Sequence, residues 1–208
     1  GLRDLTTRYG VLLIMDEVVS GFRWSLAGNQ GRYNITPDLT TMAKILAGGL
    51  PGGAVGGRAD VIDTIGKGKI AHPGTFNANP VTMVAGQAAM RLMTHAEFDR
   101  MDVLGERIRD GVTRAFADTG VDGQVTGMGS LFRIHMTSVP LTDYRTSLSA
   151  AIHAPKLARV IRNLQDNGVL ISPTGLGALS TPMTEVEIDH FLEIFKTALH
   201  DTADQSAA

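Results

Sequence analysis

The sequence is organised around residues 11–23, which read V-L-L-I-M-D-E-V-V-S-G-F-R. The first five residues, Val11 to Met15, are all apolar, and a run this short suits a strand buried on both faces better than a helix. Two acids, Asp16 and Glu17, follow directly. Because ligands of open α/β sheets bind beyond the carboxyl ends of the strands, the run predicts that Asp16 anchors a cationic part of a ligand. The alternative is an acidic pair that closes the strand and caps a turn.

The composition is that of an ordinary globular protein. With 208 residues and 43% apolar residues, the chain is long enough for one large domain, or one domain and a smaller one. A formal net charge of −2, with no run of lysine and arginine, argues against nucleic-acid binding. The absence of cysteine excludes disulfides, thiolate metal sites and a cysteine nucleophile. No apolar stretch approaches the roughly 20 residues that span a bilayer. Because the start also lacks a signal-peptide pattern, we expect a soluble cytoplasmic protein.

The first ten residues read as the last turns of a helix that is closed by Gly10. A helix that ends just before a buried strand belongs in the middle of an α/β unit. We therefore expect the chain to be the C-terminal piece of a longer protein, with part of any site in the other piece.

A second short run, Leu39–Ala43, ends at Lys44, after a polar, loop-like stretch at 21–37. Behind Lys44 comes A-G-G-L-P-G-G-A-V-G-G, in which three glycine pairs favour a shaped loop that approaches a ligand or a second chain. A further loop, H-P-G-T-F-N-A-N-P at 72–80, leads into a helix that Asn79 caps.

The segments after this loop predict helices and then a change of architecture. Residues 81–93 are apolar or small on nearly every side, which predicts a buried helix. Thr94–Glu97 is a capping box for the next helix. The apolar stripe of that helix is Phe98, Met101, Leu104, Ile108 and Val112. We place a domain boundary between residues 119 and 120.

The remaining residues, 120–208, predict a small α+β domain. A half-covered strand is expected at Leu131–Met136, an irregular segment at 137–155, a helix at 156–167 and a short strand at Val169–Ile171. Thr184–Glu187 is a second capping box. The helix that it opens has the stripe Ile188, Phe191, Leu192, Phe195 and Leu199.

Lys44 and Asp16 together indicate a type of chemistry. An exposed lysine, with a pKa near 10.4, is a poor nucleophile at neutral pH, whereas a partly desolvated one can form a Schiff base and move protons. A pyridoxal phosphate (PLP) site needs such a lysine, a carboxylate at the pyridine nitrogen and donors for the phosphate. Asp16, Lys44 and the glycine-rich segment match this set.

Three motifs carry a resemblance to a known family: D-E-V-V-S-G-F-R, P-D-L-T-T-M-A-K-I-L-A-G-G-L-P-G-G-A-V-G-G-R and H-P-G-T-F-N-A-N-P. In this order they resemble the class III, fold-type I PLP-dependent aminotransferases, and within that class the glutamate-1-semialdehyde aminomutase branch. The resemblance implies an α/β fold. Residues 1–119 would be the C-terminal part of the large, mostly parallel-sheet PLP-binding domain with its connecting helix, followed by the small domain at 120–208.

The resemblance also implies roles for four residues. Asp16 would keep the pyridine nitrogen protonated, and Val18, on the same face of the strand, would press against the ring. Lys44 would form the Schiff base with PLP and carry the proton between Cα and C4′. Thr75 would donate to the cofactor phosphate across a homodimer interface. The implied reaction transfers an amino group between an amino-acid or amine donor and an oxo acceptor, and this chain alone would be inactive.

Three alternatives stay open at the level of sequence. S-G-F-R-W is similar to the aminomutases, which shift an amino group within one molecule, whereas H-P-G-T-F-N-A-N-P is closer to aminotransferases acting on β-amino acids or other amino donors. An apolar strand ending in Asp-Glu also describes the Walker B strand of a P-loop ATPase, although G-K-G-K-I at 66–70 fails the phosphate-loop pattern. Finally, the chain could serve only in assembly.

Other residues have weaker signals. We expect Glu17 to be a solvated acid at the end of the strand, and Arg133 to be a surface charge rather than a partner of a substrate carboxylate. The nine methionines are expected to fill the core. The histidines lack metal-ligand spacing, so structural or surface roles are expected, without a metal site; they are His72, His95, His135, His153, His190 and His200.

Overall fold

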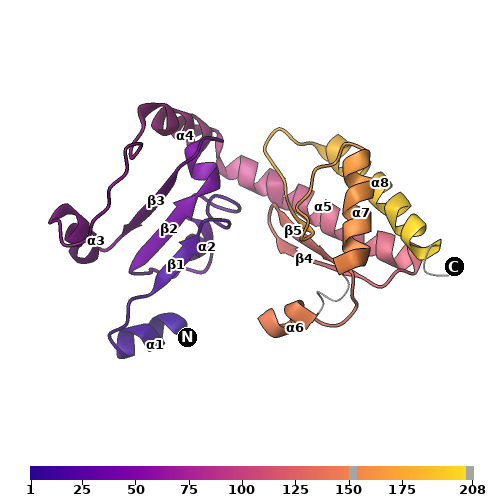
Figure 1. Cartoon of the computed structure of the whole chain (residues 1–208), viewed down its shortest axis with the longest axis horizontal. Coiled ribbons are helices and arrows are strands. Elements are labelled where there is room, and N and C mark those ends of the chain that lie inside the picture. The colour runs from indigo at the N-terminus through magenta and orange to yellow at the C-terminus, as the bar shows by residue number, and fades with distance from the viewer. Residues whose placement is uncertain (150–153, 205–208) are drawn as a thin grey trace. The chain divides into compact units, whose positions relative to one another are not determined.

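The first sheet is built around a parallel pair of strands, β1 (Ile14–Glu17) and β2 (Leu39–Ala43). Their register places Asp16 beside Thr41. β3 (Gly53–Gly57) pairs antiparallel with the other edge of β2, so the strand order is β1-β2-β3 (Figure 1). The strand predicted after the polar stretch is confirmed, whereas the glycine-rich stretch predicted as a loop contains β3.

The helices of this part of the chain are α1 (Leu2–Arg8), α2 (Gly28–Arg32), the 3-10 helix η1 (Lys44–Ala47), α3 (Ala59–Gly66) and α4 (Pro80–Leu92). The end of α1 before Gly10, which has φ +64°, is as predicted. The side chain of Asn79 accepts hydrogen bonds from the first turn of α4, which confirms the predicted cap. The stretch at 21–37, predicted as a loop, contains α2.

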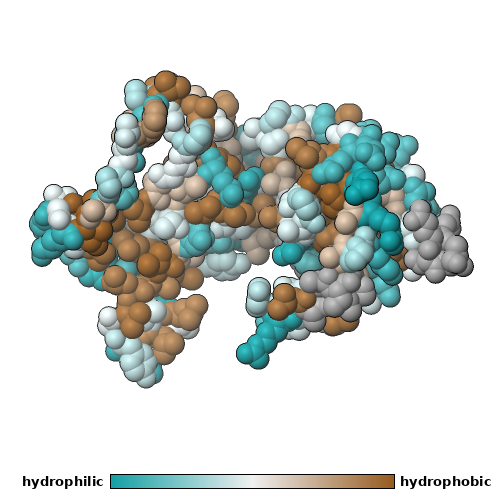
Figure 2. Space-filling model, in the orientation of Figure 1, coloured by the Kyte–Doolittle hydropathy of each residue, from teal (hydrophilic) through white to brown (hydrophobic). Residues whose placement is uncertain are grey.

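β1 and α4 are more exposed than the sequence predicts. Val11 and Ile14 are each 56% exposed, so the expectation of a strand buried on both faces is wrong. α4 was predicted to be buried, but Val81, Met83 and Val84 are largely exposed. Figure 2 shows apolar surface over α4. The expectation failed because an apolar composition indicates that a face will be covered but does not identify the covering element. No described residue covers these side chains.

The second sheet is antiparallel in the order β4-β5-β6. Its strands are β4 (Gln124–Met128), β5 (Leu131–His135) and β6 (Leu176–Ala178). The accompanying helices are α5 (His95–Thr119), α6 (Tyr144–Ser149), α7 (Ala154–Asp166) and α8 (Glu185–Asp204). Side chains of α5, β5, α7 and α8 form one buried core, in which the rings of Phe116 and Phe195 meet edge to face at 5.5 Å.

This core confirms several sequence predictions. The α5 stripe is buried throughout, and so is the α8 stripe except for the partly buried Leu192. Both capping boxes make their expected bond: Thr94 Oγ1 accepts from the backbone of Glu97, and Glu187 accepts from Thr184. Two predictions are wrong. Val169–Ile171 is not a strand, and the segment expected to be irregular contains α6 and the start of α7, while its residues 150–153 lie outside the described ones.

The computed structural model describes residues 1–149 and 154–204, which fall into two units, Gly1–Asp99 and the chain from Arg100 onward. This division lies within α5, earlier than the predicted boundary at 119/120, because Met101 and Leu104 already belong to the core of the second unit. The assignment of 1–119 and 120–208 to a large and a small domain remains a prediction. Within the described residues, no helix is both long and apolar enough to cross a membrane.

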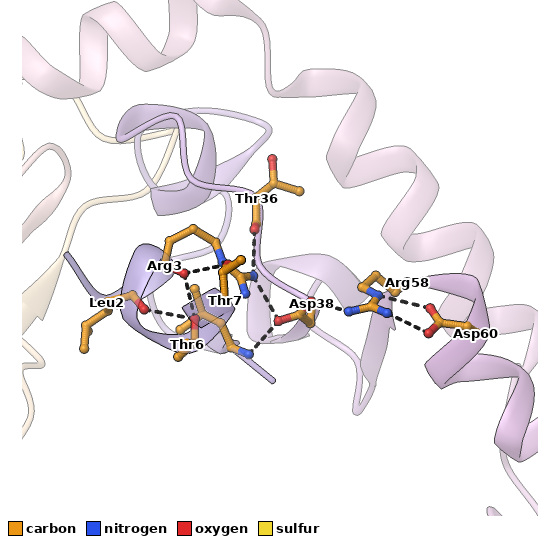
Figure 3. Close-up of polar contacts among 9 residues, drawn as sticks. Leu2, Arg3, Thr6, Thr7, Thr36, Asp38, Arg58 and Asp60 are labelled. Atoms are coloured by element: carbon orange, nitrogen blue, oxygen red, sulfur yellow. Dashed lines mark hydrogen bonds and ion pairs between the residues drawn. The ribbon is translucent and has the colours of Figure 1, made fainter. Parts of the chain in front are cut away.

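The carboxylate of Asp38, at the start of β2, ties the first unit together (Figure 3). It is 5% exposed and accepts hydrogen bonds from Leu13 N (2.7 Å), Arg3 (2.9 Å) and Arg58 (2.9 Å). Arg58 also forms a two-point ion pair with Asp60 at the start of α3. The backbone N–H of Leu13 and the guanidinium groups of Arg58 and Arg3 hold the pKa of the Asp38 carboxyl well below its usual range.

We predict that Asp38→Asn lowers the thermal unfolding midpoint of the protein by several degrees at pH 7. Because the folded-state pKa lies well below that of the unfolded chain, the carboxylate stabilises the fold fully above about pH 4, and this stabilisation is lost progressively as the pH falls from there toward the folded-state pKa. The gap between wild type and variant should therefore be constant near neutral pH and narrow steadily between about pH 5 and pH 3. Thermal scans across this range test it.

Asp63→Asn is the matched control, because Asp63 in α3 is an exposed acid paired with the exposed Lys67 just past the end of that helix. Exposed pairs of this kind contribute little to stability. A gap for Asp38→Asn that is no larger than the gap for Asp63→Asn, or that does not depend on pH, would contradict the role of Asp38.

Candidate functional site

The carboxyl ends of β1 and β2 meet at one edge of the first sheet because the two strands run parallel. Asp16 is the third residue of the four-residue strand β1, and Lys44 follows directly after the last residue of β2. The structure therefore brings Asp16 and Lys44 to the same edge, as the sequence predicts. Asp16 lies within the strand rather than beyond it.

Asp16 is exposed, and its two carboxylate oxygens differ. Oδ1 accepts hydrogen bonds from Val18 N (2.9 Å) and Thr41 Oγ1 (3.3 Å), which fix the orientation of the carboxylate. Oδ2 accepts no hydrogen bond from residues 1–149 or 154–204. This oxygen can therefore accept a hydrogen bond from a protonated nitrogen of a ligand.

Lys44 is exposed, and its Nζ makes neither a hydrogen bond nor an ion pair with the described residues. Its backbone has φ +53°, a left-handed conformation that is uncommon for a residue other than glycine. Such strain is found most often at functional sites. β2 ends here, and η1 begins at Lys44 itself.

η1 is held by close backbone contact with α4. A side chain on Gly48 would place its Cβ 2.4 Å from the carbonyl oxygen of Ala85, and one on Gly86 would place it 2.3 Å from that of Leu46. Gly48 also has φ +60°. The first glycine pair after Lys44 therefore allows the backbone that follows the lysine to pack against α4. The sequence did not indicate this contact.

Val18 lies in the turn after β1, half-buried, and not on the strand as predicted. The prediction assumed that the strand extends two residues past Asp16. Instead the chain turns, and Val18 N–H reaches back to the Asp16 carboxylate. Arg23, also half-buried, follows this turn, and burial lowers the pKa of its guanidinium.

Thr75 is exposed in the loop between α3 and α4. Asn77 shapes this loop by donating from its side chain to the carbonyl of His72 (3.2 Å). Thr75 Oγ1 makes no hydrogen bond with the described residues. The structure thus brings Asp16, Val18 and Lys44 to one edge of the sheet, while Thr75 lies on a separate loop.

The burial of Glu17 was not predicted from the sequence. The residue was expected to be a solvated acid, but it is 1% exposed. Alternation along β1 directs it to the face opposite that of Asp16. The strand pattern alone could have indicated this opposite face, but not its burial.

The remaining candidates have structural or surface positions. Arg133 is exposed and donates to the carbonyl of Thr174 (3.2 Å). His135 is buried beside Thr126 Oγ1 (3.0 Å), and burial together with the nearby Arg133 lowers the pKa of its imidazole. His153 lies outside the described residues. Within them, no group of three or more histidine and acidic side chains is placed to hold a metal ion.

The family description Aminotransferase class-III matches residues 1–199, so the chain belongs to the class-III aminotransferase family. This confirms the family that the three motifs indicated and excludes the P-loop ATPase. Glutamate-1-semialdehyde 2,1-aminomutase 2 of Lachnoclostridium phytofermentans is 41% identical over 182 residues, which are 86% of this chain and 42% of that protein.

Solved structures confirm the expected fold class. An omega-transaminase from Sphaerobacter thermophilus has a TM-score of 0.91 and 48% identity over 97% of this chain and 47% of its own. A transaminase solved with PLP bound has a TM-score of 0.87 and 35% identity over 100% of this chain and 48% of its own. The chain thus spans about half the length of the relatives it matches.

Proposed function

We propose that the whole protein is a PLP-dependent aminotransferase that moves an amino group between an amino-acid or amine donor and an oxo acceptor. One observation carries this proposal: at the same edge of the sheet, Asp16 presents a carboxylate oxygen and Lys44 an amine that have no hydrogen-bond partner among the described residues. PLP requires such an amine, such a carboxylate and phosphate donors. The residues present therefore fit the cofactor.

Each residue has a distinct task in this proposal. When bound, PLP supplies an electron sink for the carbon that loses its proton. Asp16 Oδ2 holds the proton on the ring nitrogen, because a nearby negative charge favours the protonated form. Lys44 Nζ would attach the cofactor and would then take and return the proton of substrate Cα, a general base role that contributes about 10²–10⁴-fold. Val18 would pack against the ring, and Thr75 Oγ1 would donate to the phosphate.

An amino shift within one molecule is the second candidate. It is supported by the 41% identity to an aminomutase, whereas the 48% identity to an omega-transaminase supports transfer between two substrates. Both reactions use the same four residues. The choice between them depends on substrate contacts, and none of the four residues is assigned to the substrate.

We further propose that the working unit is a cytoplasmic homodimer in which Thr75 reaches the cofactor of the partner subunit. The support is that Thr75 is exposed and that its hydroxyl makes no hydrogen bond with the described residues of its own chain. The chain by itself is expected to be inactive, because its relatives are about twice as long.

Asp16→Asn is predicted to keep the fold and lose most of the turnover of the whole protein. Asparagine retains an oxygen for Val18 N–H but provides no charge. An opposite charge shifts a pKa by about 1–3 units, each worth a factor of ten, so kcat should fall about 10–1000-fold. Steady-state kinetics with Asp63→Asn as control measures this, and a near-wild-type rate would leave Asp16 as a structural acid.

Mixing a Lys44→Ala protein with a Thr75→Ala protein is predicted to restore activity that each variant lacks. In a mixed dimer with cross-subunit sites, one site carries both defects and the other has native Lys44 and Thr75. Up to about half of the sites of each mixed dimer should therefore work. Mixed dimers that demonstrably form without recovering activity, from two severely impaired parents, would place the phosphate contact within one chain.

A further inference from the structure

Glu17 is a buried acid that has no cation beside it among the residues that the structure describes. It is one of the largest fully buried side chains of the protein, at 1% exposure, and it forms no ion pair with the described residues. A buried carboxylate is unfavourable unless hydrogen bonds replace its water. The partners of Glu17 therefore indicate what the residue does.

These partners come from the segment that follows β1. The carboxylate accepts hydrogen bonds from the hydroxyl of Ser20 and from Gln30 N (2.9 Å) in the first turn of α2. The Glu17 carbonyl oxygen also accepts from Gly21 N (2.9 Å). Gln30 in turn accepts from the buried Thr40 of β2 through its side chain (3.3 Å). Glu17 thus links the turn, α2 and, through Gln30, the neighbouring strand.

Gly28 leaves the space that this arrangement needs. A Cβ at this position would lie 2.8 Å from both Cδ and Oε1 of Glu17, and the φ of +61° favours glycine in any case. α2 therefore approaches the carboxylate more closely than any residue with a side chain at position 28 would allow. The close approach of α2 and the two hydrogen bonds to the Glu17 carboxylate together hold this carboxylate in place.

The same turn determines the orientation of Asp16. Val18, between Glu17 and Ser20, donates its N–H to Asp16 Oδ1. We propose that Glu17 is a positioning residue for the cofactor: by fixing the turn from Val18 to Ser20 it holds Val18 N–H on Asp16, and so keeps Asp16 Oδ2 directed at the ring nitrogen. Glu17 acts from the opposite face of the strand and does not touch the cofactor. This role rests on the proposed function of Asp16.

The test uses the whole protein loaded with PLP and measures two properties of each variant. One is the pH midpoint of the absorption change of the bound cofactor, and the other is the thermal unfolding midpoint. The variants are Glu17→Gln, which keeps the volume and removes the charge, and Ser20→Ala, which removes one hydrogen bond. Asp16→Asn is the positive reference. Asp38→Asn is the matched control, because it neutralises a buried carboxylate at the amino-terminal end of β2, away from Lys44.

Glu17→Gln and Ser20→Ala are expected to move the absorption midpoint in the same direction as Asp16→Asn and by less, about 0.3–1 pH unit, or roughly two- to tenfold in proton affinity. Asp38→Asn should lower stability and leave the absorption midpoint in place. If Glu17→Gln does not fold, Ser20→Ala decides the result.

Two outcomes would overturn the proposal in distinguishable ways. If Asp16→Asn moves the absorption midpoint while Glu17→Gln and Ser20→Ala match Asp38→Asn, Glu17 is only structural and the proposed function stands. If Asp16→Asn itself leaves the midpoint unchanged, the proposed role of Asp16 is wrong, and the role of Glu17 fails with it.

Discussion

The buried carboxylate of Asp38 is the interaction on which the stability of the first unit depends. Its bond to Leu13 N fixes the start of β1 against the start of β2, while Arg3 and Arg58 join it from α1 and from the end of β3. The parallel register that begins there places Asp16 beside Thr41 and leaves Lys44 just past the end of the second strand. A slip of one residue would turn the Asp16 side chain to the other face of the sheet.

Local sequence patterns predicted those parts of the fold whose partners are near in sequence. Capping boxes at Thr94 and Thr184 and the helical stripe of α5 depend on spacings of three and four residues, and they are confirmed. Burial was predicted less well, because an apolar run such as Val11–Met15 indicates that a face will be covered without indicating what covers it. The burial of Glu17 depends on Gln30, thirteen positions away, and no local pattern indicates that pairing.

Sequence patterns likewise predicted some features of the candidate site and not others. Asp16 and Lys44 follow short apolar runs, and the carboxyl ends of parallel strands meet, so their proximity could be predicted from the sequence. The positive φ of Lys44 could not, because the neighbouring glycines were the expected positions for that conformation. Nor could the contact between η1 and α4, which needs glycine at both 48 and 86. Motif resemblance supplied the role of Thr75, and the structure adds that Thr75 is exposed in the loop between α3 and α4.

Chemical trapping can test whether Lys44 is the residue that carries the cofactor. Borohydride reduction of the PLP-loaded whole protein makes a carbon–nitrogen link to lysine permanent, so that digestion and mass spectrometry can locate it. We predict a pyridoxyl group on Lys44, whose amine has no partner among the described residues and lies at the edge that also carries Asp16. A label on Lys67 or Lys69, or on no lysine of this chain, would contradict it.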